Sequence, residues 1–266
     1  MLTPTSKNFI LIIVVLVIAI VSLFVLSLTY DSQGFTIMKL IKIIFGQKLS
    51  REENLLFFQF RLPRLIIANL VGMGLGIAGA VLQGISRNVL ADPGISGINA
   101  GAGLAVILFM YCSQPILLGA SWFAVLVLPF WGLVGGLGTA VLVYILSRKH
   151  GAIEPQRFLL VGIAINMGMS ALSMYVTLKM SPADFHLATI WSTGAIIHFD
   201  WKHIVAILPW FLILIPCIFR KTHILDVFQL DEISVKSLGI SINKEQTILL
   251  LSSAGLISAC VCGRQY

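Results

Sequence analysis

Long apolar runs recur along this chain. Phe9 to Leu28 contains no charged residue, and about 20 apolar residues carry a helix across roughly 30 Å of hydrocarbon. Further runs follow at about 65–86, 95–112, 121–146, 158–178, 202–219 and 246–262. In lipid the backbone must satisfy its own hydrogen bonds, so each run is expected to be a helix. The pattern predicts an all-α, polytopic transmembrane bundle with seven spans, in one domain covering residues 1–266.

Composition supports membrane burial. Of the 266 residues, 58% are hydrophobic and 11% are charged, whereas soluble domains have roughly 25% charged residues. Too few polar groups remain to cover a water-facing surface. The first run is longer than a signal-peptide core, and no small-residue cleavage site appears near 27–30. It is therefore expected to remain as a helix.

Lys and Arg predict the orientation. With the N-terminus inside, nine of these residues fall on each side, but six of the outside ones lie in segment 29–64. Without that segment, nine Lys and Arg residues lie inside and three lie outside, namely Lys179, Lys202 and Arg264. This difference favours a cytoplasmic N-terminus. The stretch FTIMKLIKIIFG at 35–46 predicts an amphipathic helix on the membrane surface. Trp191 and Trp201 are expected in the aromatic belt.

Carboxylates are absent from the predicted spans. All eleven lie outside them or at their ends: Asp31, Glu52, Glu53, Asp92, Glu154, Asp184, Asp200, Asp226, Asp231, Glu232 and Glu245. Ion-coupled transporters usually hold an ionisable group at membrane depth, so a self-powered transporter is disfavoured, although sodium held by backbone carbonyls stays open. The chain also has no G-x-x-x-x-G-K-[ST] loop. If it pumps, the energy comes from another chain, and this chain is not predicted to be an enzyme.

Small residues mark two predicted helix contacts. The first stripe has a spacing of four residues and comprises Gly72, Gly76, Ala80 and Gly84. The second comprises Gly132, Gly135, Gly136 and Ala140. Such stripes let two membrane helices approach closely.

Candidate metal ligands are sparse. His198, Asp200 and His203 cluster in an outside loop, and Cys260-x-Cys262 has no partner pair. A metal site would need better-defined geometry and usually another ligand. The sequence therefore predicts no metal and no cofactor, and cysteines in apolar runs argue against disulfides.

The longest polar insert, 220–245, reads RKTHILDVFQLDEISVKSLGISINKE. Apolar residues recur among its charges, which predicts two short amphipathic helices joined near Leu230–Asp231, with Gly239 as a C-terminal stop. The insert is either a loop folded back on its own bundle or a docking surface for a cytoplasmic partner. A second polar break, RNVLADPG at 87–94, separates two apolar runs and predicts a turn.

Several motifs together resemble one transporter family. They are RLPR at 61–64, G…GAVLQG…RN-x-LADPG-x-x-G from 72 to 97, NAGAG at 99–103, RFLLVGIAIN at 157–166, W-x-x-G at 191–194 and LDEISVKSLGI at 230–240. As a set, over about 55–257, they resemble the FecCD-type permeases. These are the membrane subunits of binding-protein-dependent ABC importers for ferric siderophores, haem and vitamin B12.

The resemblance implies roles for particular residues. Arg61 and Arg64 correspond to arginines that pair with glutamates of the external binding protein. Asn88 and Leu90 correspond to an inner gate, with Pro155 and Gln156 near another inner constriction. The 220–245 insert corresponds to coupling helices that rest on the ATPase, which gives the coupling residues Leu230, Asp231, Glu232, Ser234, Leu238 and Gly239.

The sequence departs from the family pattern at three places. Val89 stands where the family usually has proline, which predicts a less rigid turn. Asp231 stands where it often has glycine. Such permeases have roughly ten helices in related halves, so a chain reading CVCGRQY at its end is expected to be a C-terminally truncated form lacking the last helices.

The resemblance implies a multi-pass permease of a bacterial cell membrane, with ferric siderophore as the first expected cargo. Its expected partners are cytoplasmic ATPase subunits, an extracytoplasmic binding lipoprotein, a second permease copy or a paralogue, and membrane lipid, but no nucleic acid. Two alternatives stay open: an ion-coupled secondary transporter or channel, and a non-functional permease fragment.

Overall fold

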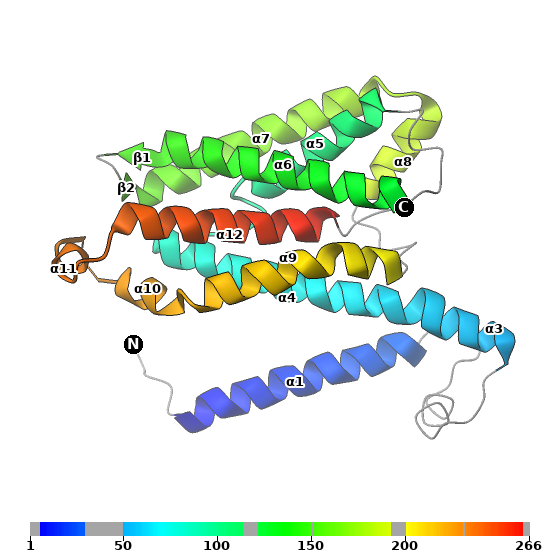
Figure 1. Ribbon diagram of the computed structural model, residues 1–266, viewed down its shortest axis with the longest axis horizontal. Helices are drawn as coiled ribbons and strands as arrows, with labels where there is room; N and C mark the ends of the chain where they lie inside the picture. The colour runs from blue at the N-terminus through cyan, green and yellow to red at the C-terminus, as the bar shows by residue number, and fades with distance from the viewer. Residues whose placement is uncertain are drawn as a thin grey trace. The chain divides into compact units, whose positions relative to one another are not determined.

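The computed structural model describes residues 6–29, 50–113, 122–149, 152–192, 201–230 and 232–262 (Figure 1). The chain forms two compact units, Met1–Ile66 and Ile67–Tyr266, and each is taken by itself. The predicted surface helix at 35–46 lies outside the described residues, as do His198 and Asp200 of the predicted outside loop.

The first unit holds one long apolar helix and the beginning of another. Helix α1 spans Ser6–Thr29, and α3 spans Arg51–Asn54. A capping box starts α3, because Ser50 Oγ accepts from Glu53 N at 3.2 Å and Glu53 Oε2 accepts from Ser50 N at 3.1 Å. A π-helical stretch, η1 (Leu55–Arg61), leads directly into α4 (Leu62–Ser86), most of which lies in the second unit. The apolar cluster of the first unit consists of Phe24, Leu28, Phe57 and Leu65.

The second unit is a bundle of helices with one small hairpin. Its further elements are α5 (Ile98–Cys112), α6 (Trp122–Ser147), β1 (Arg148–Lys149), β2 (Ala152–Ile153), α7 (Pro155–Leu178), α8 (Pro182–Ser192), α9 (Trp201–Phe219), α10 (Thr222–Val227), α11 (Glu232–Ser237) and α12 (Ile242–Cys262). The strands pair antiparallel, with Arg148 opposite Ile153. This hairpin is a small addition to the predicted all-α fold.

Helices α5 and α12 form the centre of this unit. Helix α12 lies between α6 and α9 and also contacts α5 (Figure 1). Its side chains are buried almost without interruption from Leu249 to Val261. Burial on all sides places α12 in the core of the bundle, although Ser252, Ser253 and Ser258 are among its buried residues.

Small residues bring α5, α6 and α12 into close contact, as the second predicted stripe requires. A Cβ atom added at Gly136 would collide with Ser258 of α12, and one at Gly101 would collide with Thr139 of α6. At Gly135 it would lie 2.5 Å from the carbonyl oxygen of Gly101. Only a glycine permits backbones to approach this closely, so this prediction is confirmed.

The predicted helical membrane bundle is confirmed, and each of the seven apolar runs contains a helix among the described residues. Among the described residues, five helices are long and apolar enough to cross a membrane: Asn8–Leu28, Arg51–Ser86, Phe130–Ser147, Pro155–Leu178 and Trp201–Phe219. Helix α5 has 15 residues and is shorter than a full span. Helix α12 has 21 residues, but its first turn carries Asn243, Lys244 and Glu245.

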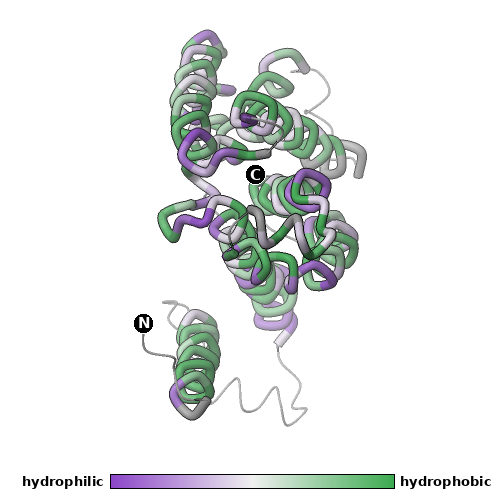
Figure 2. Tube along the Cα trace, turned by 90° about the vertical axis from the view of Figure 1, so that its left-hand side faces the viewer, coloured by the Kyte–Doolittle hydropathy of each residue, from purple (hydrophilic) through white to green (hydrophobic). Residues whose placement is uncertain are grey.

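One end of the second unit collects its polar chain connections. There α4 and α9 end, α7 and α12 begin, and the hairpin and α10–α11 lie beside them (Figure 1). Hydrophilic residues face the viewer at this end in Figure 2, whereas the helices behind are mainly hydrophobic. We call it the hairpin end.

Candidate functional site

The predicted turn after α4 is the first part of a segment that folds back into the bundle. Arg87 has a φ of 50°, so the left-handed conformation ends α4. Asn88 Oδ1 accepts from Leu90 N at 2.8 Å, and Gln83 Nε2 donates to the carbonyl of Val89 at 3.1 Å. Val89 and Leu90 are 82% and 74% exposed. Asn88 therefore holds the turn in shape, and Val89 and Leu90 form its tip.

The second part of this segment is stabilised by its own side chains. Asp92 Oδ1 accepts from Gly94 N at 2.7 Å, and Ser96 Oγ donates to the carbonyl of Pro93 at 2.8 Å. The backbone nitrogens of Ile95 and Ser96 also donate to the carbonyl of Asp92, each at 3.1 Å. These bonds satisfy polar backbone groups that no helix satisfies here.

Glycines show how far the segment re-enters. A Cβ at Gly79, seven residues before the end of α4, would lie 3.5 Å from Pro93 Cδ. Gly97 has a φ of 78°, and a Cβ there would lie 3.1 Å from the carbonyl oxygen of Gly162, seven residues into α7. Seven helical residues correspond to about 10 Å. Helix α5 thus begins well inside the bundle, which is why the predicted span 95–112 is shortened to Ile98–Cys112.

Non-helical backbone at this depth is tolerated where it lines a cavity, and a cavity of about 410 Å³ is present. We call it the re-entrant cavity. Its lining comes from α4, the re-entrant segment, the first turn of α5 and the end of α12: Leu75, Gly76, Asp92, Pro93, Gly94, Asn99, Cys260 and Val261. Asp92 is the one charged residue among the described residues of this lining.

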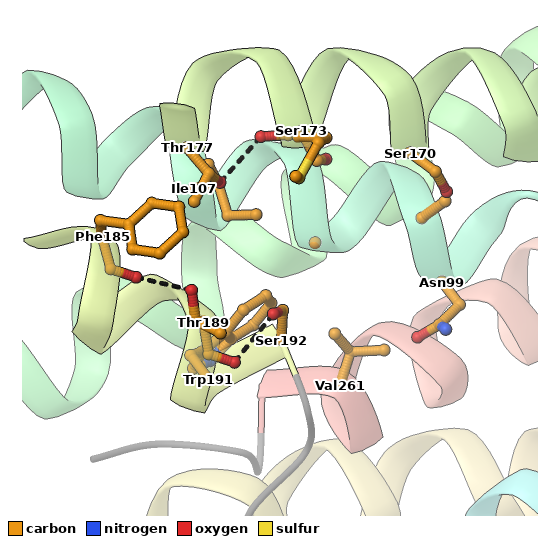
Figure 3. Close-up of a pocket in the computed structure, with 13 residues that line it drawn as sticks. Asn99, Ile107, Ser170, Ser173, Thr177, Phe185, Thr189, Trp191, Ser192 and Val261 are labelled. Carbon is orange, nitrogen blue, oxygen red and sulfur yellow. Dashed lines mark hydrogen bonds between the residues drawn. The ribbon is translucent and has the colours of Figure 1, made fainter. Parts of the chain in front are cut away.

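A second cavity of about 380 Å³, the α8 cavity, adjoins the first because both are lined by Asn99 and Val261. Figure 3 shows hydroxyl groups from α7 and α8 around it. Thr177 Oγ1 donates to the carbonyl of Ser173 at 2.8 Å, and Thr189 Oγ1 donates to that of Phe185 at 2.7 Å. Because both hydroxyl protons are already donated to backbone carbonyls, the two hydroxyl oxygens face a bound molecule as hydrogen-bond acceptors. No charged side chain is found among those residues of its lining that the structure describes.

Trp191 corrects one sequence-based expectation. Its side chain is only 7% exposed, lines the α8 cavity and packs over Gly103 of α5. Among the described residues its Nε1 has no hydrogen-bond partner. The predicted place in the aromatic belt is therefore wrong for Trp191, because α8 folds against α5 and α7 instead of lying at the surface. Trp201, at the start of α9, is 42% exposed.

Helix α8 is a further element that the sequence did not predict. The sequence S-P-A-D at 181–184 contains a signal for the start of a helix. Ser181 Oγ accepts a hydrogen bond from Asp184 N at 3.3 Å and donates one to Asp184 Oδ2 at 2.5 Å. Proline at the first helical position completes the signal. The predicted spans 158–178 and 202–219 leave this segment in the outside connection between them.

The two predicted docking arginines lie at the junction of η1 and α4, one turn apart. Arg61 is half-buried, and its Nη1 donates to the carbonyl of Leu28 at 3.0 Å. That carbonyl is near the end of α1, where helix carbonyls need external donors. Arg64 is exposed.

Pro155 and Gln156 begin α7 at the hairpin end. Pro155 occupies the first helical position, where its missing N–H costs nothing. Gln156 is exposed. The preceding Glu154 forms a salt bridge of 3.7 Å with Lys149 of the hairpin.

The insert at 220–245 forms two short helices, as predicted, and Gly239 ends the second with a φ of 74°. The insert folds back on the bundle through Ile224, Phe228 and Val235, which are buried in the core. Leu230 and Leu238 are 46% and 61% exposed. Ser234 is half-buried. Asp231 and the side chain of Glu232 lie outside the described residues.

Two contacts connect this insert to the spanning helices. Leu225 of α10 packs against Gly84, where an added Cβ would lie 2.8 Å from Leu225 Cδ2. Lys221 forms an ion pair with Glu245 in the first turn of α12. A displacement of α10 would therefore be passed to α4 and α12.

Only part of the first predicted small-residue stripe, on α4, contacts another element of the structure. Gly84 has the contact with Leu225, whereas Gly72, Gly76 and Ala80 are exposed. The close approach on α4 instead occurs at Gly74, where an added Cβ would lie 2.8 Å from Phe211 Cζ. A helix partner for the three exposed positions stays a prediction.

The spanning helices, the re-entrant segment and the two adjoining cavities, whose mainly apolar walls carry a few polar groups, define a polytopic membrane permease. Residues 12–263 match the model of the FecCD transport family. The chain is 46% identical over 244 residues to the iron-uptake system permease protein FeuC of Bacillus subtilis, covering 92% of this chain and 72% of FeuC. It is 42% identical over 261 residues to the iron(3+)-hydroxamate import system permease protein FhuG of the same organism, covering 98% of this chain and 77% of FhuG.

The fold has a counterpart among solved structures. A structure described as an inward-facing conformation of a metal-chelate type ABC transporter matches with a TM-score of 0.74 at 24% identity, covering 94% of this chain and 74% of that chain. The protein belongs to the FecCD transport family. It is a permease subunit of an ABC importer and is not itself an enzyme.

Proposed function

We propose that this permease carries ferric siderophores across a bacterial cell membrane, using ATP hydrolysed by a separate subunit. The relatives FeuC and FhuG, at 46% and 42% identity, are an iron-uptake and an iron(3+)-hydroxamate permease. The observation that supports this proposal most is that the re-entrant cavity and the α8 cavity adjoin each other between α5, α7, α8 and α12. A cargo rich in oxygen can exchange neutral hydrogen bonds with Asn99 and the lining hydroxyls, and weak neutral contacts allow release.

The orientation follows from the charges of the second unit. Arg87, Arg148, Lys149, Arg157, Arg220, Lys221 and Lys244 lie at the hairpin end, and Lys179 and Lys202 lie at the other. Positive residues accumulate on the cytoplasmic side. The hairpin end is accordingly the cytoplasmic end, and the chain begins inside and reaches Arg61 and Arg64 outside.

Arg61 and Arg64 dock the external binding protein through its carboxylates. Arg–carboxylate contacts are strong and often bidentate, and they orient a partner. Arg64 is exposed, whereas Arg61 also donates to Leu28. Arg64 therefore provides the freer docking group, and Arg61 both docks and fixes the end of α1.

The tip formed by Val89 and Leu90 closes the cytoplasmic end of the pathway, together with the start of α7 at Pro155 and Gln156. Asn88 contributes by holding the tip through its bond to Leu90 N. Since Asp92 and Pro93 line the re-entrant cavity and lie two and three residues beyond this tip, a movement of the tip changes the cavity directly.

The coupling helices α10 and α11 rest on the ATPase. Leu230 and Leu238 are exposed apolar side chains at the cytoplasmic end, suited to a protein contact. The Leu225–Gly84 contact and the Lys221–Glu245 pair transmit the motion. The working assembly contains two permease chains, identical or paralogous, because a second chain completes the pathway wall beside the exposed stripe of α4.

Reconstitution tests this function. The chain is placed in proteoliposomes with its ATPase and binding protein, and uptake of a radio-iron-labelled ferric hydroxamate is followed. Uptake that requires ATP supports the proposal. Uptake driven by a sodium or proton gradient without ATP would establish a secondary transporter, and no uptake beside an active intact paralogue would establish an inert fragment.

A further inference from the structure

A basic cavity lies at the cytoplasmic end of α9, away from the proposed pathway. Its volume is about 620 Å³, and its lining includes Ile213, Pro216, Arg220, Lys221, His223 and Glu245. We call it the Arg220 cavity. Among the described residues, its lining includes none of those proposed for docking or gating, but it shares Lys221 and Glu245 with the contacts proposed to transmit coupling.

The lining changes from apolar to basic along one helical face. A turn at Arg220 and Lys221 separates α9 from α10. Arg220 N still donates to the carbonyl of Pro216 at 3.0 Å, so Arg220 continues the last turn of α9. Residues three and seven apart share a helix face. Ile213, Pro216 and Arg220 therefore follow one another along it, with the charge at the end.

The charges of the lining favour an anion. Lys221 is paired with Glu245, so these two cancel. The guanidinium of Arg220 remains as a permanent positive charge. Arg220 and His223 are both exposed, so an anion outside the bundle can reach them.

The depth of the site matches a phospholipid. Arg220 directly follows the last residue of a candidate span, Trp201–Phe219, which is where headgroups lie. Ile213 is seven residues deeper, about 10 Å along the axis, at the level of acyl chains. Leu212 and Ile213 are 66% and 64% exposed, so the surface beside the cavity is itself apolar.

We propose that the Arg220 cavity binds an anionic phospholipid, with its phosphate at Arg220 and His223 and an acyl chain along Ile213 and Pro216. Guanidinium pairs with phosphate in a bidentate geometry, and basic pockets between membrane helices on the cytoplasmic side suit anionic headgroups. Because Ile224 of α10 also lines the cavity, the lipid would contact the same helix that couples the permease to its ATPase.

The test is lipid retention by the full chain, measured by native mass spectrometry in detergent with added phosphatidylglycerol or phosphatidylcholine. We expect wild type to retain phosphatidylglycerol preferentially and Arg220→Gln to lower that retention about five-fold. Arg220→Lys should retain an intermediate amount, because charge remains but the bidentate geometry is lost. The matched control is Arg157→Gln, an exposed arginine at the same end that does not line the cavity.

Three results would overturn the proposal. Retention of phosphatidylglycerol by Arg220→Gln at the wild-type level would show that another surface binds it. Full displacement of the lipid by millimolar inorganic phosphate would show a free-anion site. If Arg220→Gln retained as much lipid as wild type but captured less ATPase, the cavity would belong to a surface that binds protein. If Arg220→Gln does not fold, Arg220→Lys and His223→Gln are tested in its place. Retention of phosphatidylglycerol at the wild-type level in both variants would count against the site.

Discussion

Helices α4 and α6 each contain a small-residue stripe, and the structure uses the two stripes differently. In α6, Gly135 and Gly136 are pressed against α5 and α12, where any Cβ would collide with backbone or with Ser258. In α4, Gly72 and Gly76 have nothing within 4 Å of an added Cβ. The same sequence pattern thus marks a filled contact in one helix and an open face in the other. What differs is whether a partner helix lies within the described part of this chain.

The sharpest test of this contrast lies within α6. Gly135→Leu places its Cβ against the backbone of Gly101 and Ala102, which cannot move without separating α5 from α6. Overpacking costs about 1–3 kcal/mol or more, and here we expect loss of the folded monodisperse chain, measured by size-exclusion chromatography and thermal unfolding. The control is Gly138→Leu in the same helix, where nothing lies within 4 Å. Equal behaviour of the two variants would refute the close contact.

The re-entrant segment gives the next largest effect. Gly97→Ala combines a positive φ of 78° with contacts of 3.1 Å, whereas Gly239→Ala has a φ of 74° and open space. Backbone strain alone costs roughly 1–2 kcal/mol. We expect Gly97→Ala to lower the unfolding temperature clearly more than Gly239→Ala. If both variants lose the same stability, the packing of Gly97 against α7 is not as described.

The open stripe of α4 should behave in the opposite way. Gly76→Leu is expected to leave the stability of the isolated chain unchanged or to raise it by up to about 1 kcal/mol, since leucine favours helix over glycine. Assembly with a second permease chain, measured by cross-linking in membranes, should weaken. The buried neighbour Gly74 is the comparison, because Gly74→Leu meets Phe211 and Cys260 and should destabilise the isolated chain. Unchanged assembly would leave the stripe without a partner role.

The docking arginines should show the smallest effect on stability and a selective effect on binding. Arg64→Glu is expected to weaken binding-protein association about ten-fold without changing unfolding, because the exposed side chain is free to meet a carboxylate. Arg61→Glu should also lower stability, since its bond to the carbonyl of Leu28 is lost. Both affinities are measured by surface plasmon resonance on reconstituted chain. Wild-type affinity in Arg64→Glu would contradict the docking role.

Sequence periodicity predicted the helices well because lipid leaves the backbone few alternatives. It could not predict that 91–97 re-enters the bundle, since this depends on a distant contact of Gly97 with Gly162. It missed the burial of Trp191 for a similar reason: an aromatic near a span end fits both a surface belt and a cavity wall. The stripe at Gly72 and Gly76 shows the same limit, because small residues indicate a possible contact and do not identify the partner.

The family assignment supplies what periodicity cannot, namely roles for exposed residues. Nothing in the pattern of Leu230 or Leu238 alone separates a docking surface from a loop folded on its own bundle. The structure shows that the insert folds back on the bundle, with Phe228 and Val235 buried, and that Leu230 and Leu238 are exposed. The coupling role rests on that outer surface and stays a prediction.

Stimulated ATP hydrolysis tests the proposed coupling of this permease to its ATPase most directly. The chain, its ATPase and the loaded binding protein are reconstituted, and hydrolysis is measured with the wild-type chain and with Leu238→Glu, whose site is 61% exposed. Our account predicts that loaded binding protein stimulates hydrolysis through the wild-type chain and that Leu238→Glu loses this stimulation while remaining folded. Equal stimulation in both, or no association of the ATPase with the wild-type chain, would contradict it.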